Sequence, residues 1–445
     1  MRTDCTNGDH SRFSFWPRVR EFAVPPDMIR TATARRRVGD WAGACAAAGF
    51  DVDFDLRSVA RKHGSELASR IRSDLRYLAP DLLRWHMPRV APDGLLRPGL
   101  TITLARYGGP RPMHLVVRTA PAWADAGQRI SLALWDGSAN GLHPHPRPDR
   151  RFRLDLHRHL WDARRTDELR VRSGAADHRP LLDPGLLAVA PAVCAIERWA
   201  DEGEILCRAE GLPTSTFVVR FRARQRLVLD RDGPGLRIAS EYPAGRVTAL
   251  PVLPDAATWV LPDLELLRSG AMAADQLHPL VASALVPGHS PGDAPRIQDP
   301  PGRPRIVECR GEQHRIALVD GVLAALDHDR DELRREELLV ALTGAPLPCL
   351  QAIDAIHRRP DDLTGVRERL DHGDTAGALA VVTGLLGSDA SLRHGPLLDE
   401  LEAAVHRRIT YGLFKAGLSV AGAKCPSQPS QVRPGHYRAH PRTAH

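Results

Sequence analysis

The sequence predicts an α+β fold, with an antiparallel β-rich central domain between an N-terminal and a C-terminal helical region. Three observations lead to this. Residues 28–90 carry apolar residues at spacings of three and four, short alternating runs separated by Gly, Pro and Asp recur over 97–242, and helical spacing returns over 330–413. At 445 residues the chain is long enough for two or three domains.

The N-terminal segment 1–24 is polar with a few aromatic residues, and we expect a flexible arm. A helical region, 25–92, follows and begins at Pro25-Pro26-Asp27, where Asp27 is suited to cap a helix. The expected helices are 28–38, 41–48, 59–78 and 82–87.

The central domain, 93–287, begins with three short β patterns whose intervening turn residues predict an antiparallel meander. Residues 151–160 alternate again, which predicts a strand with Phe152 and Leu154 facing inward. A helix broken by prolines is expected over 180–199. The strands expected before it are 100–106, 113–119, 129–135, 151–160 and 169–172.

The clearest β pattern of the chain lies at 216–242, and it predicts a hairpin with a turn at 232–235. Apolar residues alternate there with arginines, so one face of the strand is arginine-lined. The guanidinium groups would lie roughly 6.7 Å apart along the strand. A guanidinium group matches the geometry of phosphate and carboxylate, so this face would accept an anion. The candidate anion-binding residues are Arg220, Arg222, Arg224 and Arg226.

The same arginines have an alternative, purely structural interpretation. Residues 201–210 are suited to form the preceding strand, and Glu204 and Glu210 would then face the arginines as cross-strand partners. The sequence alone leaves open whether the arginine face is free or already paired.

The C-terminal part is separated from the centre by 288–304, which has the composition of a linker. We expect a hairpin plus helices over 305–421 and a disordered basic tail over 422–445. The hairpin is expected at 305–309 and 314–319, and the helices at 330–342, 350–357, 363–370, 375–386 and 397–413.

Two distant segments, 35–50 and 367–386, share one pattern. Each has a basic helix end, then Gly-Asp, then a helix of small residues. The pattern predicts a tight αα-hairpin in which the Asp caps the second helix. Two copies so far apart do not form a repeat array, which normally needs three or more adjacent repeats.

The net charge of +7 gives little support for nucleic-acid binding. The tail alone supplies +4, through Lys424, Arg433, Arg438 and Arg442, so the rest of the chain is close to charge balance. Only Lys62, Lys415 and Lys424 of the 61 basic residues are lysine. This bias suggests GC-rich coding, which weakens functional arguments that depend on arginine number.

Cysteine usage and hydropathy point to a soluble cytoplasmic protein with no membrane association. The seven cysteines are dispersed, without a CxxC pair or zinc spacing, as expected for reduced thiols. No secretory h-region is visible, and the longest nearly apolar run, 186–196, is far shorter than the ~20 residues of a membrane span.

Few residues offer chemistry. His157, His159 and Asp155 are weak metal-ligand candidates, with His143, His145 and Asp149 nearby, but neighbouring arginines oppose a cation, and we expect surface histidines. Phosphate-loop, dinucleotide-binding and HExxH motifs are missing from the sequence. We therefore assign no catalytic residue, metal or cofactor.

The leading hypothesis is a non-enzymatic binding or scaffolding component that contacts a protein partner, because three differently composed regions carry no catalytic motif. One alternative is nucleic-acid or anionic-ligand binding by the arginine-lined strand. Another is a metal-dependent hydrolase around residues 143–159.

Overall fold

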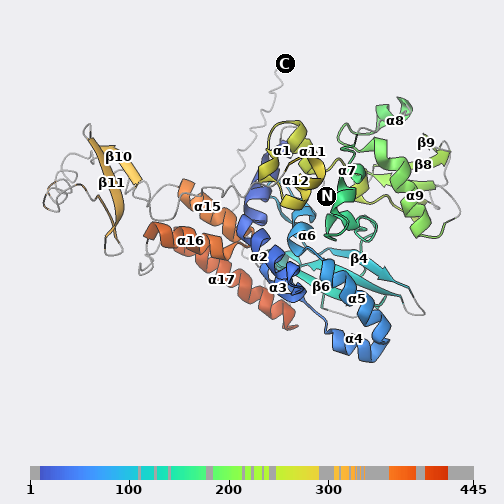
Figure 1. The fold of residues 1–445 in the computed structure, drawn as a ribbon, viewed down its shortest axis with the longest axis horizontal. Helices are drawn as coiled ribbons and strands as arrows, with labels where there is room; N and C mark the ends of the chain where they lie inside the picture. The colour runs from blue at the N-terminus through green and yellow to red at the C-terminus, as the bar shows by residue number, and fades with distance from the viewer. Residues whose placement is uncertain are drawn as a thin grey trace, which may run out of the picture.

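The computed structural model has an α+β fold, as predicted, in which helices surround a mixed four-stranded sheet (Figure 1). The structure describes residues 11–108, 112–124, 128–138, 142–176, 184–212, 216–221, 225–232, 235–239, 247–289, 305–309, 312–319, 322–325, 327, 331, 335, 360–386 and 396–418.

The central sheet has the strand order β1-β6-β5-β4. The predicted meander is confirmed, because β4, β5 and β6 pair in antiparallel fashion. The sequence interpretation missed β1, which has three residues and pairs in parallel with β6. The strands are β1 (Phe50–Val52), β4 (Thr101–Tyr107), β5 (Met113–Thr119) and β6 (Ile130–Trp135), and a separate ribbon pairs β2 (Arg89–Val90) with β3 (Leu95–Leu96).

The N-terminal region is helical, as expected. The predicted helix 59–78 is two helices, because Gly64 adopts a φ of +94°, outside the helical region, and ends the first one. The helices are α1 (Ser11–Arg18), the π-helical turn η1 (Val19–Ala23), α2 (Pro26–Arg37), α3 (Trp41–Ala47), α4 (Leu56–His63), α5 (Ser65–Tyr77) and α6 (Pro80–His86).

The expectation of a flexible arm over 1–24 is wrong for its described part, 11–24. Val19 is fully buried, and Arg20, only 3% exposed, donates hydrogen bonds to Asp263 Oδ2 (2.8 Å) and the Trp85 carbonyl (2.7 Å). A buried cation with these partners fixes the segment to the main core, which is why its polar composition did not make it mobile.

The segment after the meander differs from its predicted strands. Residues 151–160 form turns ending in a 3₁₀ helix, with one isolated bridge between Thr103 and Arg153 in place of a ladder. The predicted strand 169–172 is helical. The elements are η3 (Arg158–Leu160), η4 (Thr166–Glu168), α7 (Leu169–Arg172), α8 (Pro184–Val189), η5 (Ile196–Arg198) and α9 (Trp199–Ala209).

Residues 201–209 belong to α9, with Glu210 as its C-cap, and do not form the strand that the sequence interpretation placed beside the arginines. The helix buries Trp199, Leu206 and Cys207, a spacing that fits one helical face. Gly203 allows α9 to approach the second sheet, because a Cβ there would lie 2.2 Å from a ring carbon of Phe217.

The second sheet has the order β7-β8-β9 and contains a break that the sequence did not reveal. The chain reverses between β7 (Thr216–Arg220) and β8 (Arg226–Asp232), and again before β9 (Gly235–Ile238). The second reversal, where Asp232 pairs with Gly235, confirms the predicted turn. The chain then continues through η6 (Val247–Ala249), α10 (Asp255–Thr258), α11 (Pro262–Arg268), η7 (Ala274–Gln276) and α12 (Pro279–Leu285).

The C-terminal part contains the predicted hairpin, extended by a third strand, and the predicted helices 363–370, 375–386 and 397–413. The helix predicted at 350–357 and most of 330–342 lie outside the described residues. The elements are β10 (Arg305–Cys309), β11 (Glu312–Val319), β12 (Val322–Ala325), α15 (Pro360–Asp371), α16 (Thr375–Leu386) and α17 (Pro396–Lys415). Figure 1 shows α15–α17 beside α2 and α3, with β10 and β11 beyond them.

The two αα-hairpins predicted from the shared pattern are confirmed. Asp40 accepts a hydrogen bond from the Gly43 amide (2.8 Å), and Asp374 accepts one from the Gly377 amide (2.9 Å). In each hairpin an arginine five residues earlier contacts the capping carboxylate. The shared sequence pattern therefore reports a shared local structure.

Candidate ligand-binding site

One row of polar residues crosses the central sheet. The strand register aligns Asp51, Ser131, Arg118 and Thr101 on neighbouring strands. The adjacent row is apolar, because each strand alternates between its two faces: Val52, Leu132, Val117 and Ile102. The sheet thus presents a polar row directly beside its hydrophobic core.

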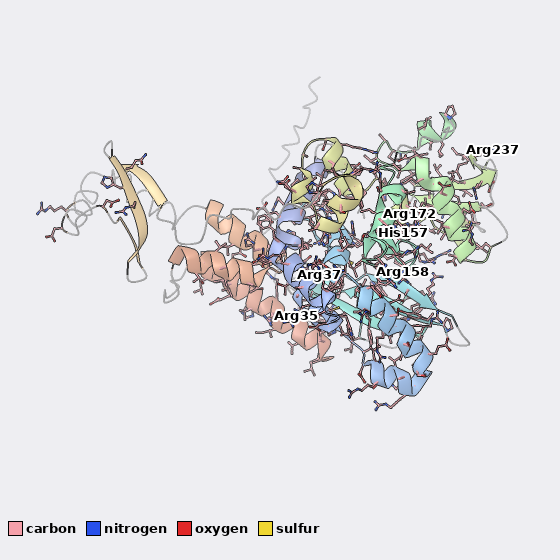
Figure 2. The ribbon with its side chains drawn as sticks, in the orientation of Figure 1. Arg35, Arg37, His157, Arg158, Arg172 and Arg237 are labelled. Carbon is pink, nitrogen blue, oxygen red and sulfur yellow. The ribbon has the colours of Figure 1, made fainter. Side chains whose placement is uncertain are left out.

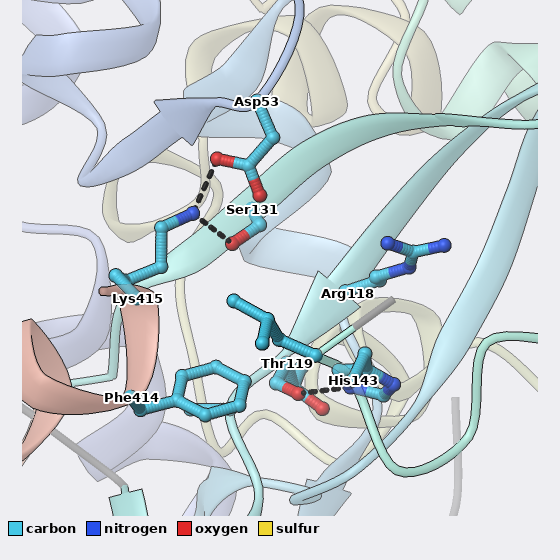
Figure 3. Close-up of a pocket in the computed structure, with 9 residues that line it drawn as sticks. Asp53, Arg118, Thr119, Ser131, His143, Phe414 and Lys415 are labelled. Atoms are coloured by element: carbon cyan, nitrogen blue, oxygen red, sulfur yellow. Dashed lines mark hydrogen bonds and ion pairs between the residues drawn. The ribbon is translucent and has the colours of Figure 1, made fainter. Parts of the chain in front are cut away.

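A cavity of about 370 Å³ lies over this polar row (Figure 3). Its floor comes from the sheet, one wall from the segment 142–143, and another wall from the last residues of α17. The described residues that line it are Asp53, Arg118, Thr119, Ala120, Ser131, Leu142, His143, Phe414 and Lys415.

Lys415 joins α17 to the sheet side of the cavity. Its ammonium contacts the carboxylate of Asp53 and lies 3.3 Å from the hydroxyl of Ser131. Asp53 follows β1 directly, and its amide donates to the Leu132 carbonyl at 2.8 Å, which holds it beside β6. Lys415 therefore has a counter-charge within the protein.

Arg118 differs from Lys415 in having no such partner. Its Nε is buried without a hydrogen bond, and among the described residues we find no ion pair to its guanidinium. Burial lowers the pKa of Arg118, an effect that the more distant charge of Asp53 only partly opposes. In Figure 3 no dashed line joins Arg118 to another lining residue.

His143 shapes the cavity as a neutral ring. Its Nε2 lies 3.0 Å from the Thr119 carbonyl, and its Nδ1 lies 3.2 Å from the amide of His145. Burial lowers the pKa of His143, so the ring is uncharged at neutral pH. This residue, considered from sequence as a neighbour of a metal site, instead bonds to the protein backbone.

The end of α17 is held against the sheet by a small set of contacts. The Tyr411 hydroxyl donates to Asp51, which also accepts from Arg129. Phe414 packs edge-to-face on Trp123, with 5.4 Å between ring centroids. Burial, together with the hydrogen bond to Asp51, raises the pKa of Tyr411, so its hydroxyl remains a donor.

A second cavity, of about 470 Å³, contains more arginines but already balances most of them. Arg153 binds Asp155 through two 2.8 Å hydrogen bonds and also contacts Glu210. Arg106 contacts the same two acids, at 3.3 Å and 3.2 Å. The described lining residues are Arg70, Ser73, Asp74, Ala105, Arg106, Tyr107, Arg153, Asp155, Arg158 and Ala209.

The remaining groups of the second cavity are also paired. Arg158 contacts Asp74 and donates to Asp162 at 3.0 Å, while the Tyr107 hydroxyl donates to Asp74 at 2.7 Å. Burial alone would lower the pKa of Arg158, but its hydrogen bonds to Asp74 and Asp162 outweigh this and raise it.

The arginine-lined strand predicted at 216–242 is not one continuous row. Arg220 ends β7 and Arg226 begins β8, so these two face each other across the strand pair. Arg222 and Arg224 lie outside the described residues. The predicted cross-strand acids are elsewhere: Glu204 pairs with Arg231 at 2.5 Å, and Glu210 pairs with Arg106 and Arg153, two arginines of the second cavity.

The weak metal candidates do not converge. His157 lies 3.1 Å from Glu202, whereas Asp155 binds Arg153. The expectation of surface histidines is wrong: His157 and His159 are 1% and 3% exposed, because the segment turns inward instead of running as an edge strand. Figure 2 shows His157 beside Arg172, the second partner of Glu202. Within the described ranges, no group of three or more His, Cys, Asp or Glu residues is placed to hold a metal.

Sequence reasoning did not identify Asp53, Arg118, Ser131 or Lys415 as a site. Two signals were present. Lys415 is one of only three lysines in an arginine-biased chain, and Arg118 and Ser131 are polar residues within largely apolar strands. Neither signal brings the residues together without the strand register and the position of α17.

Comparisons with known proteins add no family. No protein-family model matches the chain, and no curated protein or solved structure is detectably similar to it. Across the part of the chain that the structure describes, each helix is too short or too polar to cross a bilayer.

Proposed function

We propose that this protein is a non-enzymatic binding protein whose ligand is a small amphipathic anion, a carboxylate or phosphate attached to an apolar body. The observation that carries the proposal is the unpaired Arg118 guanidinium in the first cavity. A partly buried cation is costly unless something supplies its counter-charge.

The charges of the cavity favour an anion. Lys415 and Asp53 offset each other, so Arg118 leaves one positive charge on the lining. A guanidinium can donate two parallel hydrogen bonds to a carboxylate or phosphate. The hydroxyls of Ser131 and Thr119 lie on the same lining and are further potential donors.

The rest of the lining favours an apolar body on the ligand. Phe414, Leu142 and Ala120 contribute apolar surface to the same lining. The volume of about 370 Å³ is at the lower end of the range for small-molecule pockets, roughly 300–1,000 Å³. This size supports a compact ligand over a nucleic-acid strand, which was the partner considered for the arginine-lined strand.

Isothermal titration calorimetry with benzoate and phenyl phosphate tests the proposal, and the two probes distinguish carboxylate from phosphate ligands. Benzyl alcohol is the uncharged control. We expect Arg118→Met to weaken binding about 10- to 100-fold, because a hydrogen bond to a charged group contributes roughly 1.5–3 kcal/mol.

The matched control is Arg70→Met, which removes an arginine from the second cavity and should leave the affinity unchanged. Failure of both anions to bind at millimolar concentration would contradict the proposal. Equal affinity for benzyl alcohol, or undiminished binding by Arg118→Met, would also contradict it.

Contact with a protein partner stays a prediction. The surface feature that favours it is an apolar row on α17, where Val405, Ile409 and Leu413 are spaced by four and are 58%, 54% and 38% exposed. The hypothesis predicts that a partner retained by the wild-type protein from its native host is lost when Val405 and Ile409 become Asp.

A further inference from the structure

We infer that ligand binding in the first cavity controls the docking of α17 on the central sheet. This inference rests on the proposed function, and it adds regulation to the same site. The site then couples a small anion to the position of the C-terminal half of α17.

The cavity exists only while α17 is docked. Phe414 and Lys415 form one wall, and the sheet residues that they face lie hundreds of positions earlier in the chain. Removal of α17 would leave Arg118 and Ser131 on an open sheet face. A ligand that contacts both sides would therefore bind the docked form more tightly than the undocked form.

The contacts that dock this end of α17 are few. The apolar part is a cluster of four residues, Ala120, Ala124, Tyr411 and Phe414, whereas the main core unites most helices and strands of the body. The polar part consists of Tyr411 with Asp51, and of Lys415 with Asp53 and Ser131. Because these contacts are few, a ligand that contacts both α17 and the sheet would add substantially to the interaction that holds them together.

The other half of α17 has a separate anchor. Leu397, Leu401 and Ala404 pack on the hydrophobic cluster of α15 and α16. The C-terminal half can therefore leave the sheet while the helix keeps its contacts with the other two. This separation makes docking a local equilibrium that does not require the protein to unfold.

Hydrogen–deuterium exchange of the full-length protein measures that equilibrium directly. A ligand that binds only the docked form at a hundredfold excess over its Kd lowers the population of the open form about 100-fold. We expect benzoate at this excess to slow amide exchange over 405–415 by up to about 100-fold. Exchange in α9, distant from the cavity lining, should not change.

Paired tyrosine variants test the docking contact itself. Tyr411→Phe removes the hydroxyl bound to Asp51 without altering a lining residue, and it should speed exchange over 405–415. Tyr107→Phe removes an equivalent hydroxyl–carboxylate hydrogen bond from the second cavity and should leave that segment unchanged. Benzoate should slow exchange in both variants.

The possible failures can be told apart. Benzoate and phenyl phosphate that do not bind in calorimetry would contradict the proposed function. Binding with unchanged exchange over 405–415 would contradict only the inference about docking. Slowed exchange in Arg118→Met to the same extent as in the wild type would also overturn it, because the bridge requires that guanidinium.

Discussion

The two cavities differ in the pairing of their arginines more than in the number of arginines. The larger cavity has four, and Arg106, Arg153 and Arg158 are each paired with two carboxylates. The smaller cavity has one, Arg118, and no carboxylate pairs with it among the described residues. A binding site for an anion is indicated by an unbalanced charge, so the cavity with fewer arginines is the better candidate.

The difference has a local cause. Two of the pairs in the larger cavity join residues that are close in sequence, Arg153 with Asp155 and Arg158 with Asp162. Arg118 lies in a strand between Val117 and Thr119, so its only possible partners are on other elements.

The largest expected effect tests whether pairing in the larger cavity is structural. Asp155→Ala removes the carboxylate that accepts two hydrogen bonds from Arg153, whose side chain is only 6% exposed. Breaking a buried pair in this way costs about 3–5 kcal/mol of unfolding free energy. Chemical denaturation measures the loss.

Asp53→Ala is the comparison in the smaller cavity. Its pair with Lys415 is about a third exposed, at 31% and 28%, so we expect a loss of no more than about 1 kcal/mol. Similar losses for the two variants would show that the cavities do not differ in the way described.

An intermediate effect concerns a buried base at the α15–α16 turn. His372 has no hydrogen-bond partner on either ring nitrogen, and burial, reinforced by Arg89 and Arg84, lowers its pKa to about 3. The unfolded chain, with a histidine pKa near ~6.5, binds the proton more readily. Stability is therefore constant above about pH 6.5 and falls as pH decreases towards 3.

At pH 5 this histidine should cost about 2 kcal/mol of stability relative to pH 7, since each pKa unit corresponds to about 1.4 kcal/mol. His372→Gln should reduce the difference between denaturation curves recorded at pH 7 and pH 5. The exposed His63, changed to Gln, is the control and should leave the difference as in the wild type. An unchanged pH dependence in His372→Gln would refute the assignment.

The smallest effect is expected for Arg70, the exposed arginine of the larger cavity. Its guanidinium lies 5.4 Å from the centre of the Tyr107 ring. Arg70→Ala should lower stability by about 0.5–1 kcal/mol, the usual range for an exposed cation–π contact. A loss of stability as large as that of Asp155→Ala would mean that the exposed Arg70 also stabilises this cavity.

Local patterns predicted much of the fold. The strand 113–119 and the Asp40 and Asp374 caps follow directly from alternation and from Gly-Asp spacing. The strand predicted from alternation at 151–160 is wrong. Phe152 and Leu154 are buried, but the segment forms turns, and its pairing with a strand is limited to one isolated bridge. Charge patterning failed at 201–210, because Glu204 lies on a helix whose apolar residues repeat at helical spacing and not on a strand beside the arginines.

The candidate site could be predicted only in fragments. Lys415 and the polar residues of β5 and β6 are visible in the sequence. The arginine row from which anion binding was predicted is interrupted by the chain reversal between β7 and β8. Hydrophobic periodicity states which face of a strand is buried. It does not state which distant element covers the other face.

By itself, the sequence determined the helices and strands with strong periodicity and their caps, because these depend on interactions within a few residues. The tertiary structure decided which arginine stays unpaired. The strand register places Arg118 opposite Ser131. Lys415, 284 residues after Ser131 in the chain, reaches the same cavity from α17, but its charge is paired with Asp53. Charge balance inside a cavity depends on all the elements that line it.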